Sequence, residues 1–266
     1  MKVFISADIE GITTTTVWDE TDPSHGSYHA HAKQMTDEVL ACIEGAKKAG
    51  AKEITVKDAH GIPSTNIDPM RMPSGVTLLR NWYGHPYAMA EGIDSSFDAA
   101  MFVGYHSAIS RPGNPLSHTM SGKLVYIKLN GELASEFMLY SYACALEGIP
   151  TVFLSGDKML CDDVRDMHPN LITCPVKDGI GSMTINYSPE DTLASIKELS
   201  EKALKQNLTG ALVKLPDHYE VEICYKDHAY AEKMSWFPDV TRDSDTVISF
   251  RSEDYFEILR TINWVV

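Results

Sequence analysis

Side chains that could bind a metal ion follow a short apolar run at the start of the chain. Residues 3–5 are apolar, and they are followed by Asp8 and Glu10, two carboxylates that lie two positions apart. Strand periodicity directs both to the same side, and carboxylates held so close repel each other unless a cation lies between them or one is protonated. We favour a divalent metal ion at a strand end, and the alternative is a solvated strand end whose Glu10 caps a turn.

The same pattern recurs at two later points in the sequence. Residues 53–57 lead into Asp58 and His60, and residues 99–105 lead into His106. Because open α/β sheets bind their ligands at the carboxyl ends of parallel strands, we expect these side chains to meet at one edge of a sheet. The recurrence favours a shared metal site over three unrelated strand ends.

Further candidates lie after the third run. His118 follows the proline-rich loop 107–117 and is either a surface residue or a catalytic imidazole above the metal site. Glu136 falls in the first turn of a predicted buried helix capped by Ser135, where it either interacts with the helix dipole or binds a metal ion. Glu132 competes for the ligand role from a more exposed turn.

Strand and helix patterns alternate along the chain and predict an α/β fold with a right-handed crossover between parallel neighbours. We expect a metal-binding catalytic domain over residues 1–207 and a smaller C-terminal α+β portion over residues 208–266. The expected helices cover residues 29–50, 86–92, 135–148, 157–167, 188–207 and a segment from 252, and the expected strands cover residues 3–8, 53–58, 76–80, 99–106, 123–129, 150–157, 171–176, 219–225 and 246–250.

Composition and charge restrict the partners of the protein. The formal net charge of −14 over 266 residues makes nucleic acid and anionic membrane surfaces poor partners. We expect a cytoplasmic protein, because the N-terminus has no charged and apolar leader and no apolar stretch is long enough to span a bilayer. The five cysteines contain no Cys-x-x-Cys pair, so we expect no zinc site built from thiolates. The three histidines between residues 25 and 31 have no partnering strand, so we do not expect them to bind metal.

The order and spacing of these motifs resemble the D-aminopeptidase family of zinc peptidases, closely as far as residue 157. The motifs that carry the resemblance are Ser6-x-Asp8-x-Glu10-Gly11, Asp58-x-His60, Gly104-Tyr105-His106, Ser117-His118-Thr119-Met120, the Glu136 helix and Ser155-Gly156-Asp157. The resemblance implies a three-layer α/β/α fold with a mostly parallel or mixed sheet. It also implies a homo-oligomer, a decamer of two stacked pentamer rings.

The resemblance also implies the roles of individual residues. Two zinc ions per subunit would share Asp8, and the remaining ligands would be Glu10, His60, His106 and Glu136, with His118 in the catalytic role. Imidazole and carboxylate donors without thiolates suit Zn²⁺, and Mn²⁺ or Co²⁺ are alternatives. We expect Asp58 to orient His60 through its other ring nitrogen. The run from Phe137 to Tyr140 departs from the usual family pattern, which we expect to alter the pocket wall.

The predicted function is a metal-dependent aminopeptidase that hydrolyses short peptides, with a D-configured N-terminal residue implied by the resemblance. One alternative is another dimetal amidohydrolase or a phosphoesterase. The scarcity of basic residues near the ligands, where only Lys57 and Arg111 are close in sequence, counts against a phosphoesterase. A second alternative is a non-catalytic peptide-binding accessory protein, which would have no use for an unligated His118 beside the metal ions.

Overall fold

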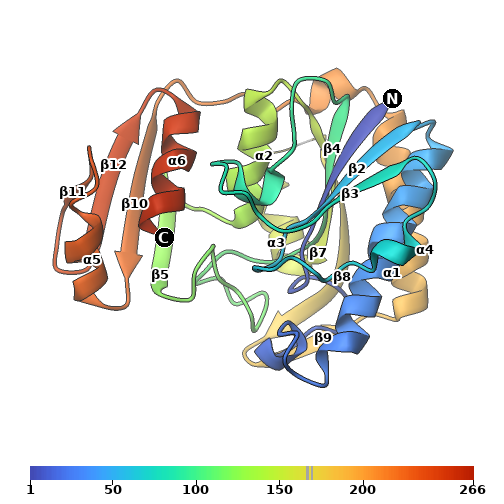
Figure 1. Cartoon of the computed structure of the whole chain (residues 1–266), viewed down its shortest axis with the longest axis horizontal. Helices are drawn as coiled ribbons and strands as arrows, with labels where there is room; N and C mark the ends of the chain where they lie inside the picture. The colour runs from blue at the N-terminus through green and yellow to red at the C-terminus, as the bar shows by residue number, and fades with distance from the viewer. Residues whose placement is uncertain (166–167, 169) are drawn as a thin grey trace.

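Two β-sheets organise the chain, of which this computed structural model describes residues 1–165, 168 and 170–266 (Figure 1). The larger sheet has seven strands in the order β3-β2-β1-β4-β7-β8-β9, and the smaller has five in the order β11-β12-β10-β5-β6. The strands are β1 (Lys2–Ala7), β2 (Glu53–Asp58), β3 (Val76–Leu79), β4 (Ala99–Tyr105), β5 (Leu124–Leu129), β6 (Glu132–Leu133), β7 (Thr151–Asp157), β8 (Ile172–Ile180), β9 (Met183–Asn186), β10 (Tyr219–Tyr225), β11 (Thr241–Arg242) and β12 (Val247–Ser252).

Helices cover both faces of the larger sheet, which confirms the predicted three-layer arrangement. The α-helices are α1 (Tyr28–Lys48), α2 (Glu136–Leu146), α3 (Lys158–Asp163), α4 (Pro189–Lys205), α5 (His228–Met234) and α6 (Tyr255–Val265). Short 3₁₀ helices are η1 (Trp18–Glu20), η2 (Pro69–Arg71), η3 (Ala88–Ala90) and η4 (Leu208–Ala211). Helices α1 and α4 pack together on one face, and α2 lies on the other, between the two sheets (Figure 1).

Two apolar cores hold these layers together. One lies between the larger sheet and the pair α1 and α4, and it includes Val39 and Ile43 of α1 and Ile196 of α4. The other surrounds α2 and extends to α6 and the smaller sheet. Burial of each large apolar side chain stabilises the fold by about 1.5–3 kcal/mol, so the two cores fix the sheet edge at which the strands end.

The central strands run in parallel and bring their carboxyl ends together. Strand β1 pairs with β2 on one side and with β4 on the other, and Ala7 is in register with both Asp58 and Val103. The predicted crossover from β1 through α1 to β2 is therefore confirmed, as is the mixed sheet, because β9 at the edge is antiparallel to β8. The side chains that follow β1, β2 and β4 consequently lie on neighbouring strands.

The smaller sheet combines segments from two parts of the chain. Strands β5 and β6 form a hairpin, in which Asn130 and Gly131 both have positive φ, and β5 pairs with β10 from the C-terminal region. The boundary expected after residue 207 stays a prediction, and residues 124–133 supply two strands to this sheet from before that boundary.

Several short elements differ from the sequence-based expectations. The structure adds β9, β11 and α5, which the sequence patterns did not separate from loops, and β8 extends to Ile180 because it pairs with β9. Helix α3 ends at Asp163, and the expected helix end at Met167 lies outside the described residues. In the described part of the chain, every helix is too short or too polar to cross a membrane.

Glycines let the backbone after β1 lie directly against the end of β4. The amide of Gly11 donates to the carbonyl oxygen of Gly104 over 2.8 Å. Gly104 has a φ of +72°, and a Cβ atom there would lie 2.3 Å from the carbonyl oxygen of Asp8. No side chain fits at that distance, so this close approach is what brings the residues after β1 near those after β4.

We expect the substitution Gly104→Ala to lower the free energy of unfolding by about 2 kcal/mol or more, because the left-handed backbone and the contact with Asp8 both resist a side chain. Chemical denaturation would measure the change. Gly26→Ala is the matched control, because a Cβ atom at Gly26 would meet nothing within 4 Å. Equal stabilities of the two variants would contradict the argument.

Candidate metal centre

Two groups of buried donor atoms meet at the carboxyl ends of β1, β2 and β4. Each group has three donor atoms that lie within 4.8 Å of one another, and Asp8 belongs to both. The groups are Asp8, Glu10 and His60, and Asp8, His106 and Glu136. A third group that meets the same condition, Glu10, His106 and His118, links the two. All six side chains that the sequence singled out for ligation or catalysis therefore lie together.

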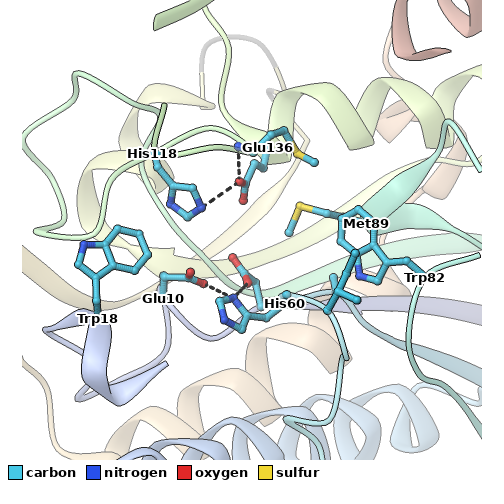
Figure 2. Close-up of a pocket in the computed structure, with 13 residues that line it drawn as sticks. Glu10, Trp18, His60, Trp82, Met89, His118 and Glu136 are labelled. Carbon is cyan, nitrogen blue, oxygen red and sulfur yellow. Dashed lines mark hydrogen bonds and ion pairs between the residues drawn. The ribbon is translucent and has the colours of Figure 1, made fainter. Parts of the chain in front are cut away.

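The first group joins the ends of β1 and β2. Nδ1 of His60 lies 2.9 Å from Oε2 of Glu10 and 3.4 Å from Oδ1 of Asp8 (Figure 2). Both Glu10 oxygens are buried, and in the described residues the only ion pair of this carboxylate is with the His60 ring. A buried carboxylate is unfavourable unless a cation or a proton compensates it, so a protonated His60 or a metal ion is needed here.

The second group joins β1, β4 and the first turn of α2. Nε2 of His106 lies 3.2 Å from Oε2 of Glu136 and 3.5 Å from Oδ2 of Asp8. Nδ1 of His106 is 3.0 Å from the carbonyl oxygen of Ser107. Because a carbonyl can only accept, Nδ1 carries the hydrogen and the lone pair of Nε2 in the neutral ring faces the two carboxylates. This is the tautomer that a metal ligand needs.

Helix α2 presents Glu136 at its buried N-terminus. The side chain of Ser135 accepts a hydrogen bond from the amide of Met138, which is the predicted N-cap, and Glu136 follows it directly. Oε1 of Glu136 accepts the amide hydrogen of Met120 over 2.7 Å, which leaves Oε2 toward His106. Glu132 is exposed and lies in β6, away from both donor groups.

Electrostatics in this cluster couple the carboxylates to the histidines. Burial, followed by the neighbouring Glu10 carboxylate, raises the pKa of Asp8 to about 8. Burial alone would lower the pKa of His106, but the Glu136 carboxylate raises it to about 10. Burial likewise opposes the charged form of His60, yet Glu10 and Asp8 raise its pKa well above its usual value. Without a metal ion, protons therefore supply the positive charge that the carboxylates require.

The donor set fits zinc. Buried Oδ2 of Asp8, both oxygens of Glu10 and Nε2 of His106 have no hydrogen-bond partner among the described residues, and these are atoms of the two donor groups. Carboxylate oxygen and imidazole nitrogen without thiolate suit Zn²⁺ and other borderline divalent ions. All five cysteines are free, and none belongs to a donor group.

His118 lies beside the donor groups on the loop after β4. Its ring stacks on that of His106 with the ring centres 4.4 Å apart, and the edge of Trp18 approaches it at 5.3 Å. Nδ1 donates to the carbonyl oxygen of Leu116 over 2.9 Å, so Nε2 carries the free lone pair, 3.5 Å from Oε1 of Glu136 (Figure 2). The hydroxyl of the adjacent Thr119 donates to the carbonyl oxygen of Ala134, which anchors the loop.

Asp58 contacts a different partner from the one expected. Its carboxylate accepts hydrogen bonds from the amides of Asn66 and Ile67 and from the side chain of Asn66, over 2.7–3.0 Å. Asn66 also donates to the carbonyl oxygen of His60. In the described residues no hydrogen bond links Asp58 to the His60 ring, and the two groups interact through their charges and through this loop.

Buried polar contacts from distant segments hold the backbone of Glu10. The ammonium group of Lys177 in β8 donates to the carbonyl oxygens of Glu10 and Thr15, and the side chain of Asn114 donates to the same Glu10 oxygen over 2.9 Å. Burial lowers the pKa of Lys177 to about 8. Sequence reasoning missed this lysine, which follows the apolar part of β8 and directly precedes Asp178.

The pocket walls were also missed. A cavity of about 520 Å³ opens over the donor groups, and its apolar walls are Trp18, Ile62, Trp82, Met89 and Met120. The side chains of residues 137–140 are buried in the core around α2 and none lines the cavity, but the Tyr140 hydroxyl contacts the sulfur of Met120, so their expected effect on the wall stays a prediction. The available signal was the presence of two tryptophans in otherwise polar loops.

The three loop histidines, His25, His29 and His31, belong to none of the donor groups found in the described residues. His31 contacts Glu20, with 3.4 Å between Nε2 and Oε1, and His25 contacts Asp19 at 3.5 Å. His29 is exposed.

Comparisons with known proteins agree with this arrangement. The sequence profile of a peptidase family described as D-aminopeptidase matches residues 1–264. A D-aminopeptidase of Bacillus subtilis (strain 168) is 26% identical over 259 residues, which cover 97% of this chain and 93% of the relative. The solved structure of the zinc-dependent D-aminopeptidase DppA from Bacillus subtilis, described as a self-compartmentalizing protease, superposes with a TM-score of 0.91 at 25% identity. The match covers 100% of this chain and 96% of the other.

We expect zinc binding to the metal-free protein at neutral pH to release protons, because the raised pKa values of His60, His106 and Asp8 keep these donors protonated and a ligand must be deprotonated. Zinc affinity should then increase as the pH rises. Calorimetric titration with zinc in buffers of different ionisation enthalpy measures the release. A heat that is independent of the buffer would contradict the expectation.

Proposed function

The chain belongs to the D-aminopeptidase family of peptidases, and from this premise we propose that it is a zinc-dependent aminopeptidase that removes the first residue from short peptides. A D-configured first residue is the preferred substrate. The relatives described as D-aminopeptidases, one of them zinc-dependent, support the proposal. The proposal also includes two zinc ions per subunit.

One observation carries this proposal more than any other. Two groups of donor atoms share Asp8, and Oδ2 of Asp8, both oxygens of Glu10 and Nε2 of His106 lack hydrogen-bond partners in the described residues. In the proposed assignment Asp8 would be a ligand of both ions, Glu10 and His60 would complete one site, and His106 and Glu136 would complete the other. A bridging carboxylate between two divalent ions is typical of dimetal hydrolases.

Zinc at this position would supply Lewis acidity, which polarises a carbonyl group and acidifies water. The remaining chemistry belongs to the side chains of this protein. The carboxylates of Asp8, Glu10 and Glu136 would hold the two ions and offset most of their positive charge. The apolar walls limit water around the scissile bond.

His118 is proposed as the catalytic acid and base. The hydrogen bond from Nδ1 to Leu116 fixes the ring so that Nε2 faces the pocket. From there Nε2 can take a proton and pass it to the departing amine, which must leave as a neutral group. The stacking on His106 keeps the ring close to the donor groups without making it a necessary ligand.

The cavity is poorly suited to phosphoesters. Phosphate recognition usually uses arginine or lysine, and no lysine or arginine of the described chain lines this cavity. Lys57, the nearest candidate from the sequence, is buried and donates to the carbonyl oxygen of Asn81, and Arg111 pairs with Asp163. These contacts support an amide substrate over the phosphoesterase alternative.

Assembly and location complete the proposal. We propose a homo-oligomer, with a decamer as the finer hypothesis, because the structural relative is described as self-compartmentalizing. The exposed apolar side chains Ile180, Met183 and Ile185 on the β8–β9 hairpin are available for contacts between subunits. A cytoplasmic location is supported by five cysteines that form no disulfide.

Substitution of the shared carboxylate should disturb both metal sites. We expect Asp8→Ala to reduce bound zinc from two ions to fewer than one per subunit, and Glu136→Gln to remove mainly one, because Asp8 alone belongs to both donor groups. Metal analysis after desalting measures the stoichiometry. Glu132→Gln is the matched control and should retain both ions. Equal loss from Asp8→Ala and Glu136→Gln would argue against a bridging role.

Hydrolysis of D-Ala-D-Ala and L-Ala-L-Ala tests the proposed activity. We expect the zinc-loaded protein to cleave the D-peptide and chelation to abolish cleavage. We also expect His118→Ala to lower kcat by at least about 10²-fold while zinc content is retained. His25→Ala, an exposed histidine outside the donor groups, serves as the control. Absence of turnover with zinc bound would refute the proposed function, and unchanged turnover in His118→Ala would refute the role of that residue.

A further inference from the structure

The cavity over the donor groups has a polar floor and apolar sides. Asp8, Glu10, His60 and Glu136 form the floor, and tryptophan and methionine side chains form much of the sides. In Figure 2 the carboxylates lie in the middle, Trp18 lies with His118 on one side, and Met89 and Trp82 lie on the opposite side. A peptide bond over the floor would therefore direct the groups at its two ends toward different walls.

The wall formed by Trp82 and Met89, here called the Trp82 wall, is held by buried polar contacts. The carboxylate of Glu91 accepts hydrogen bonds from three consecutive backbone amides, those of residues 83–85, over 2.8–3.2 Å. Lys57, adjacent to Asp58 on β2, lies 3.5 Å from that carboxylate and donates to the carbonyl oxygen of Asn81. The residues on either side of Trp82, Asn81 and Tyr83, are thus held in place by buried hydrogen bonds.

Met89, the other residue of the Trp82 wall, is also held by buried hydrogen bonds of its backbone. The backbone carbonyl of Met89 accepts a hydrogen bond from the hydroxyl of Ser6 over 2.7 Å, and Ser6 also bonds the Tyr105 hydroxyl. Met89 is 3% exposed, and Figure 2 shows its thioether directed toward the space between Glu136 and His60. A rigid apolar surface that is tied to β1 and β2 in this way is preorganised to receive an apolar group.

The position of His118 indicates which side of the cavity binds which part of the peptide. Under the proposed function, on which this step rests, His118 gives a proton to the departing amine, so the departing part of the peptide lies on the side of His118 and Trp18. The first residue then lies on the opposite side. We propose that the Trp82 wall binds the side chain of the first residue of the substrate, and that this side chain is large and apolar, such as leucine or phenylalanine.

Charge supports the same assignment. No basic residue of the described chain lines the cavity, so the Trp82 wall offers an acidic first side chain no partner of opposite charge. A small first side chain, such as alanine, would leave the Trp82 wall partly uncovered. Filling it with leucine removes further apolar surface from water.

The test compares kcat/KM of the zinc-loaded protein for D-Leu-D-Ala, D-Ala-D-Leu and D-Ala-D-Ala, with the L-peptides in parallel. We expect D-Leu-D-Ala to exceed D-Ala-D-Ala by about tenfold or more. In Trp82→Ala that ratio should fall toward one. Met89→Ala, which removes less volume, should reduce the ratio in the same direction if Trp82→Ala does not fold.

Two control variants make the result specific. Tyr83→Ala alters an exposed neighbour of Trp82 that does not line the cavity, and it should keep the wild-type ratio. Trp18→Ala should change the preference between D-Ala-D-Leu and D-Ala-D-Ala, which differ in the second residue. Zinc content and circular dichroism of each variant show whether the site and the fold are intact.

The outcomes separate this inference from the function on which it rests. Cleavage of D-Ala-D-Ala without a preference for D-Leu-D-Ala overturns the inference and leaves the aminopeptidase function standing. A preference that survives both Trp82→Ala and Met89→Ala does the same. Failure to cleave any of the peptides with two zinc ions bound refutes the function, and the inference fails with it.

Discussion

The mutual repulsion of three buried carboxylates governs this structure. Asp8, Glu10 and Glu136 are each at most 3% exposed, and they meet at one edge of the larger sheet. Removing ionised carboxylates from water is unfavourable unless positive charge compensates them. In the metal-free protein, His60 and His106 can supply that positive charge as protonated rings. In the proposed enzyme, two zinc ions supply it. The fold is therefore arranged to hold negative charge at a place where only a cation makes it favourable.

The rest of the architecture can be understood as the means of holding those groups in place. Parallel pairing of β1 with β2 and β4 aligns three strand ends, and the glycine contact between Gly104 and Asp8 closes the distance between them. The N-cap at Ser135 then delivers Glu136 from α2 on the opposite side of the cluster. Each of these supports lies in a buried part of the chain, so the positions of the donor atoms depend on the packing of the cores around them.

Much of this was predictable because it is encoded locally. The apolar runs that end in Asp8, Asp58 and His106 predicted the parallel strands, and the order of the motifs identified the family, which the comparisons confirm. The choice of Glu136 over Glu132 rested on the resemblance to the family, because the capping pattern alone left both glutamates as candidates. The pocket walls were not predictable in this way, because Trp18 and Trp82 come from loops with no periodicity and meet the site only through tertiary packing. The partner of Asp58 was missed for the same reason, since Asn66 reaches it by the fold of a loop.

Two buried lysines close to the cluster explain how its negative charge persists. In the described residues neither Lys177 nor Lys57 forms an ion pair with Asp8, Glu10 or Glu136. The ammonium group of Lys177 instead donates to the backbone carbonyls of Glu10 and Thr15, and that of Lys57 donates to Asn81 and approaches Glu91. Both lysines thereby stabilise the backbone that carries the site while their charge is engaged elsewhere. The carboxylates are left for positive groups that arrive from outside, which are metal ions and, in the proposed reaction, the free amine of a peptide.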